Sequence, residues 1–393
     1  MASLYGLLFF ASESLVVLFF FFRLPTLANP PFSLLNRLGG VIVFAILKST
    51  DCKESAMSAG DPSHAKRDPK EMLPTPGKLA RRRLKQRLFS IPEYLREISL
   101  VRGKDDLYRW IYFKFPYAFP LADFPTRLTI ELTNACNFKC PHCWREVMDR
   151  KVGFMEEDLF NKIVHELKPH KARTDLKIIG LGEPCLHPHF REFMGLLRHN
   201  SVSPLLYTNG TLLRLFSHEE ILDWNIQRLV VSIDGLDARS YERLRAGGKY
   251  EVVRKDLQRF YATRKKLKFR APEIEIRHVI MPDETSKQLM QFKKDWKGLG
   301  DGVKFNYLAP PWAREGVESN SRSKCRDVRR EFYIEYDGRS PLCGYAYGRE
   351  HIGDLHRETI MQLWMAPRKQ QLRDCHQRGN LDLVPLCKSC SHT

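Results

Sequence analysis

The chain has 393 residues, a formal net charge of +18 and a pI near 9.5. This length suits one barrel-sized domain with a smaller appendage. The ten cysteines fall mainly in clusters with short spacings, which argues against a disulfide scaffold and favours metal binding. The basic charge favours anionic partners such as nucleic acid, phosphorylated metabolites or lipid headgroups, although a merely soluble surface would show the same balance.

Residues 1–56 differ in composition from the rest of the chain. The apolar run Leu4–Phe22 has a glutamate in its middle, which is costly in lipid, and it lacks the basic residues that precede the apolar core of a signal peptide. A second run, Leu38–Leu47, is too short to span a bilayer. We interpret 1–56 as a mis-set start with the true start at Met57, or else as an anchor with membrane contact through 1–47; an export signal is least favoured.

Residues 57–125 form a basic and aromatic lead-in. The segment 57–77 is polar and contains prolines, which predicts disorder. Residues 78–88 include six basic residues and no acidic one. That composition is typical of a solvated helix face, and it would also suit an arm that binds anionic lipid or nucleic acid. The aromatic-rich segment 91–124 is predicted to be helical and to pack against the following domain.

Strand and helix patterns alternate between residues 126 and 310, which predicts an α/β fold made of parallel βαβ units. The predicted strands are Leu128–Leu132, Leu176–Leu181, Pro204–Thr208, Arg228–Ile233, Glu273–Ile280 and Val303–Leu308. The predicted helices are Glu156–Leu167, Pro188–His199, His218–Asp223, Val252–Lys266 and Thr285–Leu299. Six strands are too few for a closed eight-stranded barrel.

Three cysteines follow the first predicted strand with the spacing C-x3-C-x2-C, namely Cys136, Cys140 and Cys143. A loop this short can direct three thiolates at one face of a metal–sulfur cube and leave the fourth iron without a protein ligand. The loop follows the carboxyl end of a strand, where α/β barrels place their chemistry. On spacing alone, a zinc site with His142 as the fourth ligand is the alternative.

This spacing, with an aromatic residue (His142) before the third cysteine, resembles the radical S-adenosylmethionine (radical SAM) superfamily. The resemblance implies a partial (β/α)6 TIM-type barrel in which Cys136, Cys140 and Cys143 hold a [4Fe–4S] cluster. It further implies that the open iron binds the amino and carboxylate groups of SAM. One electron then cleaves SAM to a 5′-deoxyadenosyl radical.

The second predicted strand ends in Gly180-Leu181-Gly182-Glu183-Pro184. This segment is similar to the family's G-G-E-P motif, with Leu181 in place of the first glycine. Glycine allows a backbone to approach a ligand closely, and a glutamate can accept from an ammonium group. The resemblance therefore implies that Gly182 and Glu183 bind the amino group of SAM, whereas the segment taken alone would equally suit a turn.

Polar residues also end the next two predicted strands, in Tyr207–Thr211 and Val231–Gly235, and each segment alone would indicate a turn. The family places contacts to the ribose hydroxyls of SAM at the end of strand four. This makes Ser232 and Asp234 the candidates, with substrate as the alternative ligand of Asp234. At the end of strand five the family places apolar contacts to adenine, which would fall on Val279 or Ile280, although the family's glycine motif is absent here.

The C-terminal part, 311–393, holds a second set of cysteines. A predicted hairpin with an Asp-Gly turn connects Cys325 to Cys343, and the final residues contain a C-x2-C pair. From spacing alone the set would also suit a zinc ribbon. The pattern C-x12-G-x4-C followed by C-x2-C resembles the SPASM/twitch extension of radical SAM enzymes. It implies one auxiliary [4Fe–4S] cluster held by Cys325, Cys343, Cys387 and Cys390, with Cys375, in the helical stretch Met365–Cys375, left as a spare.

The resemblance covers about Arg127 to Cys390. It implies a radical SAM oxidoreductase of the maturase type that oxidatively modifies a peptide or a sugar-like metabolite, with the auxiliary cluster assisting. A general base would take the proton, and Glu131, Asp234 and His278 are candidates between which the sequence does not choose.

The expected partners are a reductant such as flavodoxin or ferredoxin and an anionic, peptide or sugar-like substrate. Thiolate-bound clusters favour a cytoplasmic location, with membrane association through the N-terminus as the alternative. Two other functions stay open. One is an RNA- or peptide-docking radical SAM enzyme that uses the basic N-terminal arm, and the other is a zinc-binding α/β protein without redox chemistry.

Overall fold

The computed structural model describes residues 4–12, 15–22, 110, 112, 114–307, 324–388 and 390. The chain divides into two units, Met1–Arg67 and Asp68–Thr393. In the first unit the initial apolar run forms an antiparallel pair of strands, β1 (Leu4–Ser12) and β2 (Leu15–Phe22). The second apolar run and the polar and basic segments between 57 and 88 lie outside the described residues. Within the described ranges, no helix has both the length and the apolar character needed to cross a membrane.

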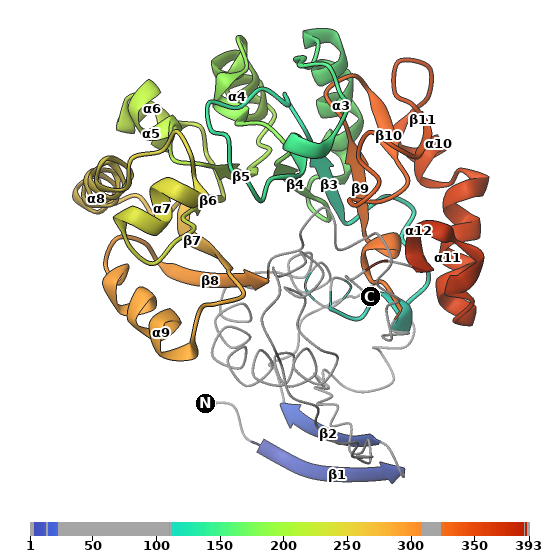
Figure 1. Cartoon of the computed structure of the whole chain (residues 1–393). Coiled ribbons are helices and arrows are strands. Elements are labelled where there is room, and N and C mark those ends of the chain that lie inside the picture. Colours follow the sequence, from blue (N-terminus) through green and yellow to red (C-terminus); the bar gives the residue numbers. More distant parts are fainter. Residues whose placement is uncertain are drawn as a thin grey trace, which may run out of the picture. The chain divides into compact units, whose positions relative to one another are not determined.

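A seven-stranded parallel sheet forms the centre of the second unit (Figure 1). Its strand order is β8-β7-β6-β5-β4-β3-β9. The strands are β3 (Arg127–Ile130), β4 (Asp175–Ile178), β5 (Leu205–Thr208), β6 (Arg228–Ser232), β7 (Glu273–Ile280), β8 (Gly302–Tyr307) and β9 (Glu331–Ile334). The six strands predicted between residues 126 and 310 are therefore confirmed, and consecutive strands are neighbours in the sheet, as βαβ units require.

Helices connect the strands and lie on the outer side of the curved sheet (Figure 1). They are α3 (Glu157–Leu167), α4 (Phe190–His199), α5 (Leu212–Leu215), α6 (His218–Asp223), α7 (Ala238–Leu244), α8 (Tyr250–Lys266) and α9 (Ser286–Asp295). The five predicted helices are confirmed. The short helices α5 and α7 were not predicted.

The two faces of the sheet differ in chemistry. Leu128 and Ile130 are fully buried in the core beneath the helices, as alternate residues of a sheet strand should be. Side chains of the opposite parity are polar and contact one another. Arg277 Nη1 donates to Tyr207 Oη at 3.1 Å, and Lys177 Nζ lies 5.2 Å from the centroid of the Tyr207 ring. The inner face is thus charged, in the arrangement of the partial barrel that was predicted.

The hairpin predicted around Asp337 and Gly338 is only partly correct. The chain does reverse there, since Glu335 N donates to Arg339 O at 2.9 Å and Gly338 has a φ of +80°. However, β9 pairs in parallel with β3, while β10 (Arg339–Pro341) pairs with β11 (His351–Asp354) in a separate antiparallel sheet. All four residues of β9 are buried, which suits a place in the large sheet better than a small solvent-facing hairpin.

The rest of the C-terminal part forms a lobe beside β9. It contains α10 (Ile360–Trp364), α11 (Pro367–Arg378) and α12 (Pro385–Lys388), and short 3-10 turns at Asp327–Arg329 and Leu381–Leu383. A small apolar core of its own includes Val328, Leu342 and Leu372. The helix predicted at Met365–Cys375 is α11. The domain boundary expected at 310/311 falls within 308–323, outside the described residues.

Candidate functional site

The three-cysteine loop follows β3, and side-chain hydrogen bonds fix the residues at its start. Thr133 Oγ1 donates to Gly153 O at 2.6 Å, and Asn134 Nδ2 donates to Lys151 O at 2.8 Å. These bonds fold the chain that follows the loop back onto the end of the strand. Thr133 and Asn134 are themselves buried, so the loop starts from a rigid point at the carboxyl edge of the sheet.

The three thiols of this loop lie in partly or fully buried surroundings. Cys140 is buried, and Cys136 and Cys143 are half-buried. Burial raises the pKa of all three thiols, that of Cys140 to about 11. A buried thiol becomes a stable thiolate when a metal ion supplies the positive charge, so this donor set suits a metal–sulfur group.

Glu183 joins three of the predicted strand-end motifs. Its backbone N–H donates to Ala135 O at 2.8 Å, and its carboxylate accepts from Thr208 Oγ1 at 2.7 Å and from Asn209 N at 2.6 Å. Asn209 Nδ2 in turn donates to Asn137 Oδ1 at 2.8 Å, inside the cysteine loop. Burial raises the pKa of Glu183 against the effect of these donors. The ends of β3, β4 and β5 therefore form one hydrogen-bonded unit.

Gly182 permits this unit to form. A Cβ at this position would lie 2.3 Å from Thr133 O and 2.4 Å from Ala135 O, closer than atoms can approach. Both neighbours are backbone atoms, which cannot move aside as a flexible side chain would. The glycine is therefore required for the backbone after β4 to touch the backbone before the cysteine loop.

Asp234 is fully buried at the end of β6 and binds three partners. Arg245 Nη2 lies 2.6 Å from its carboxylate, His142 Nε2 donates at 3.1 Å, and Val279 N donates at 2.8 Å. Burial alone would raise the pKa of Asp234, but Arg245, His142 and Val279 together outweigh burial and the pKa falls to about 2. The structure thus brings together two predicted residues, Asp234 and His142. Ser232 is half-buried two residues earlier on β6.

The segment Arg245–Gly248 also contacts the cysteine loop, and the sequence analysis missed it. Ala246 O accepts from Lys139 N at 2.8 Å, and a Cβ on the last glycine would lie 2.9 Å from the Phe138 ring. Gly247 has a φ of +102°, which favours glycine. The signal in the sequence is a Gly-Gly pair, which indicates a turn and nothing about its partner.

The other two candidate bases hold structural contacts. Glu131 is fully buried, binds Arg150 Nη2 at 2.8 Å and accepts from Leu181 N at 3.0 Å, which places it beside the cysteine loop. His278 is fully buried on the outer face of the sheet, with Nδ1 3.0 Å from a backbone carbonyl and Nε2 2.8 Å from Glu284. His278 therefore lies under α9, away from the inner face.

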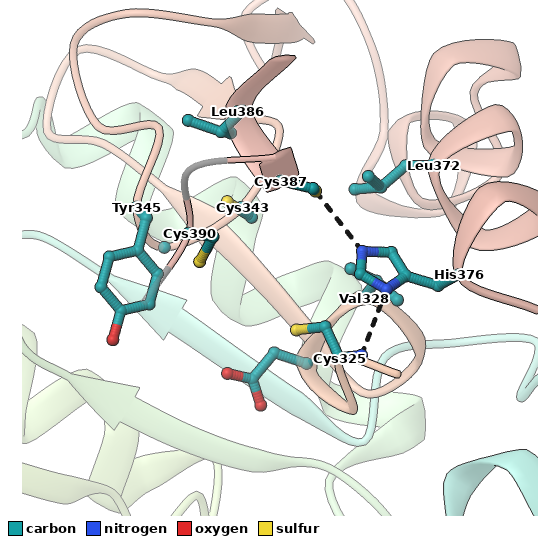
Figure 2. Close-up of a pocket in the computed structure, with 11 residues that line it drawn as sticks. Cys325, Val328, Cys343, Tyr345, Leu372, His376, Leu386, Cys387 and Cys390 are labelled. Carbon is teal, nitrogen blue, oxygen red and sulfur yellow. Dashed lines mark hydrogen bonds between the residues drawn. The ribbon is translucent and has the colours of Figure 1, made fainter. Parts of the chain in front are cut away.

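The four C-terminal cysteines line a single hollow in the lobe, as Figure 2 shows. They come from different segments: Cys325 precedes β9, Cys343 follows β10, Cys387 lies in α12 and Cys390 follows it. Cys375 is buried on α11 and does not line the hollow. Among the described residues, no three His, Cys, Asp or Glu side chains converge closely enough to hold one metal ion.

His376 and Lys369 on α11 adjoin this hollow, and the sequence analysis assigned neither a role. Both side chains are fully buried. His376 lies between Cys325 N, 3.2 Å from Nδ1, and Cys387 Sγ, 3.4 Å from Nε2 (Figure 2). Burial lowers the pKa of His376 to about 4 and that of Lys369 to about 8. A polar residue on the apolar face of a helix was the available sequence signal.

One aromatic contact connects the surroundings of the two cysteine groups. Trp144, next to Cys143, meets Tyr345, which lines the lobe hollow, edge to face with ring centroids 6.4 Å apart. The two strands that lead to these segments, β3 and β9, are neighbours in the sheet. The segment after Cys143 is therefore in contact with the segment after Cys343.

Known proteins resemble both halves of this arrangement. Residues 130–295 match the family described as the radical SAM superfamily, and residues 325–391 match the SPASM iron–sulfur cluster-binding domain. A probable GTP 3′,8-cyclase of Methanococcus maripaludis is 32% identical over 132 residues, which are 33% of this chain and 43% of that protein. The mycofactocin maturase MftC of Mycobacterium tuberculosis is 28% identical over 140 residues, 36% of this chain and 35% of that protein. The match thus spans less than half of each relative.

A solved structure has the same fold. Streptococcus suis SuiB bound to its precursor peptide SuiA superposes with a TM-score of 0.53 at 13% identity, covering 68% of this chain and 70% of that chain. At this level of identity the likeness concerns the arrangement of strands and helices.

Proposed function

Because this chain belongs to the radical SAM superfamily and carries a C-terminal SPASM domain, we propose that it is a maturase-type enzyme that oxidises a peptide. The family implies a SAM-binding [4Fe–4S] cluster and SAM as cofactors, and the SPASM domain implies auxiliary iron–sulfur binding. A zinc protein without redox chemistry is accordingly the weaker alternative.

We assign Cys136, Cys140 and Cys143 to the SAM-binding cluster. Three thiols on one short loop, at the carboxyl edge of the sheet, support this assignment. They leave one iron of a cubane open. When bound, the cluster and SAM supply a radical that takes a hydrogen atom from an unreactive C–H bond.

Around that cluster we assign Glu183 to the amino group of SAM and His142 to its adenine. Asp234 accepts the Nε2 proton of His142, so Nδ1 is left as an acceptor. Within the described part of the chain, His142 Nδ1 is buried without a hydrogen-bond partner. That supports a contact with a donor on the adenine ring. Arg245 keeps Asp234 charged, and so keeps this orientation of His142.

In the lobe we assign Cys325, Cys343, Cys387 and Cys390 to one auxiliary [4Fe–4S] cluster. Four thiols that line one hollow are enough to saturate a cubane and leave no iron for SAM. After losing a hydrogen atom, the substrate would lose one electron toward this lobe and one proton to a base, for a net two-electron oxidation. A flavodoxin or ferredoxin would return an electron to the SAM-binding site.

The contact between Trp144 and Tyr345 carries this proposal. It joins the segment after Cys143 to a residue of the auxiliary hollow. A substrate held above the sheet edge would then have the hydrogen-accepting site and the electron-accepting site on one side of the molecule. Single-electron transfer requires such proximity, whereas a purely structural cluster does not.

A peptide is favoured over a nucleotide or sugar-like substrate because of what two similar proteins bind or are named for. SuiB is bound to a precursor peptide in its solved structure, and MftC is named a maturase. Because another relative is named a probable GTP 3′,8-cyclase, the test below also includes small-molecule substrates. Docking through the basic segment 78–88 gains no support, since that segment lies outside the described residues.

The test is anaerobic reconstitution followed by two assays. The protein should bind about eight irons, enough for two cubanes, and should form 5′-deoxyadenosine from SAM and dithionite. Peptide and metabolite fractions of an extract of the source organism are then added separately. A SAM-dependent product two hydrogens lighter in the peptide fraction supports the proposal. Such a product confined to the metabolite fraction, or stoichiometric zinc without visible absorption, contradicts it.

A further inference from the structure

The hollow that the four C-terminal cysteines line is bounded on one side by α11, whose buried face is unusually polar. The buried residues of this helix are Lys369, Leu372, Arg373, Cys375 and His376. Two of them, Lys369 and His376, turn their nitrogen atoms toward the segments that carry the cysteines. Neither nitrogen takes part in an ion pair within the described residues. Burying such groups without a counter-charge is unfavourable, which suggests a ligand that compensates for it.

A hydrogen bond from a backbone amide fixes which ring nitrogen of His376 carries the proton. The backbone N–H of Cys325 lies 3.2 Å from His376 Nδ1. A backbone amide can only donate, so Nδ1 must be the acceptor and the ring proton must sit on Nε2. Nε2 lies 3.4 Å from Cys387 Sγ. When Cys387 is a metal-bound thiolate, it has no proton, and Nε2–H is the donor of this N–H···S bond.

Lys369 brings a positive charge to the segment that precedes Cys343. Its Nζ donates to Leu342 O at 2.8 Å, on the residue that precedes Cys343. The side chain is fully buried, and its ammonium group lies 5.8 Å from the centroid of the Trp364 ring. In surroundings of low dielectric, a buried charge next to the segment of Cys343 acts more strongly on an anionic group there than it would in water.

We propose that α11 raises the reduction potential of the auxiliary cluster, through the hydrogen bond from His376 to Cys387 and the buried charge of Lys369. This inference rests on the proposed function, because it takes the four cysteines as ligands. A four-thiolate [4Fe–4S] cluster becomes more negative by one charge on reduction. Donors to its sulfurs and nearby cations stabilise the reduced form more than the oxidised form. The cluster would then accept the electron that the substrate loses.

The acidic group at the hollow does not cancel this effect. Asp327 also lines the hollow, and a lone carboxylate there would lower the potential. However, Arg330 binds it with Nε at 2.8 Å and Nη2 at 2.5 Å. The Asp327–Arg330 pair is therefore close to neutral as seen from the hollow. Lys369, by contrast, has no carboxylate paired with it in the described part of the chain, and its Nζ lies beside the segment that precedes Cys343.

The experiment measures the potential of the auxiliary cluster in the full-length chain. The parent carries Cys136→Ala, Cys140→Ala and Cys143→Ala, so that only the auxiliary cluster is present, and an iron count of about four verifies this. The potential is obtained by redox titration followed by electron paramagnetic resonance. His376→Phe and Lys369→Met should each lower the equilibrium constant for reduction about tenfold, a shift of about 59 mV for one electron.

Two further variants separate tuning from general structural damage. Arg378→Met removes a charge from the exposed side of the same helix and should leave the potential unchanged, because water screens that charge. His376→Gln keeps an N–H donor at the end of a side chain of similar reach and should restore most of the parent value. If either His376→Phe or Lys369→Met stays within threefold of the parent, or if Arg378→Met shifts as far as Lys369→Met, the inference is overturned.

A second measurement needs no substitution on α11. Pulsed electron–nuclear double resonance on the reduced parent, with 15N-labelled histidine and exchange into D2O, should show a weakly coupled histidine nitrogen and an exchangeable hydrogen near the cluster. Absence of both signals overturns the role of His376 even if its variants fail to fold. A parent that folds but binds no cluster would instead refute the ligand assignment in the proposed function.

Discussion

Asp234 shows how one buried charge can orient a side chain of the cysteine loop. Its carboxylate receives bonds from Arg245, His142 and Val279, which come from three segments distant in sequence. A buried carboxylate without a cation would become protonated and could no longer fix the proton of His142 on Nε2. Arg245 is thus a positioning residue that acts on His142 through Asp234.

Replacing Arg245 by Met should expose this dependence. Breaking a buried ion pair typically lowers the free energy of unfolding by about 3–5 kcal/mol, and urea unfolding followed by circular dichroism measures it. The control is Arg198→Met, which breaks an ion pair with Asp223 that is more than half exposed and should change stability by about 1 kcal/mol or less. Equal losses in the two variants would contradict the assigned role.

The same pair predicts a pH dependence. The pKa of Asp234 is about 2 in the folded chain, below its ordinary value of 3.8. The folded state therefore binds fewer protons, and the stabilisation is complete above about pH 4 and lost as the pH falls from 4 toward 2. Arg245→Met should lose less stability across this interval than the wild type does. A parallel decline in both proteins would show that Asp234 is not held charged by Arg245.

Glu183 allows a test of cofactor binding without loss of metal. Glu183→Gln keeps one of the two oxygens that accept from Thr208 and Asn209 but removes the negative charge. This should weaken SAM binding by about tenfold or more, since a hydrogen bond to a charged group contributes about 1.5–3 kcal/mol. The iron count should stay at about eight. Glu192→Gln, on the exposed side of α4, is the matched control. Unchanged SAM affinity, measured by anaerobic equilibrium dialysis, would place the amino group elsewhere.

At the scale of elements, contacts between β3 and β9 fix the positions of these two strands relative to each other. The cysteine loop follows β3, and Cys325 precedes β9. Arg150 lies between Glu131, at the end of β3, and Glu335, at the end of β9, with Nη2 at 2.8 Å and 3.2 Å from the two carboxylates. Thr129 Oγ1 donates to the buried carboxylate of Glu331 at 2.6 Å between the same two strands. The lobe is therefore an extension of the barrel sheet as well as a separate small core.

The backbone contact at Gly182 predicts how the end of β4 and the cysteine loop depend on each other. Gly182→Ala places a Cβ against two backbone carbonyls and should push the end of β4 away from the cysteine loop. We expect the reconstituted iron to fall from about eight toward four per chain, with only the auxiliary cluster retained. Gly195→Ala is the control, since its Cβ would meet nothing within 4 Å and alanine favours a helix. A full iron complement in Gly182→Ala would refute the steric argument.

On the scale of the whole second unit, barrel and lobe are held together by contacts that bury polar groups. Ile360 N, at the start of α10, donates to Glu166 on α3 at 2.6 Å, and Trp364 Nε1 donates to Ala122 O at 2.9 Å. The lobe is thus fixed on the barrel from the side of α3 as well as through β9. An electron path between two fixed sites needs this rigidity, because transfer weakens steeply with distance.

The two clusters should therefore be separable in function. Cys387→Ala combined with Cys390→Ala removes two of the four thiols that we assign to the auxiliary cluster and leaves the cysteine loop after β3 intact. We expect this variant to form some 5′-deoxyadenosine from SAM and dithionite but no oxidised product. Iron analysis at about four per chain and electron paramagnetic resonance verify the first cluster. Product formation at the wild-type rate would mean that the auxiliary cluster takes no part in the oxidation.

Local patterns in the sequence were enough for the fold class, the six strands from Arg127 to Tyr307 and the two cysteine groups. These features depend on short-range periodicity and on thiol spacing, which a single chain displays directly. The same patterns identified Gly182, Glu183 and Asp234 as strand-end residues of interest. They could not indicate which groups these residues would meet.

Only the tertiary structure decided the long-range contacts. The pairing of β9 with β3 joins residues about 200 positions apart. The sequence of neither strand identifies the other as its partner, since hydrophobic burial is non-directional. Arg245 beneath His142, and His376 beside Cys387, are likewise ordinary helix-end and helix residues until folding brings them to the thiols. Their protonation and charge follow from burial and from partners that distant segments supply, and no local pattern contains that information.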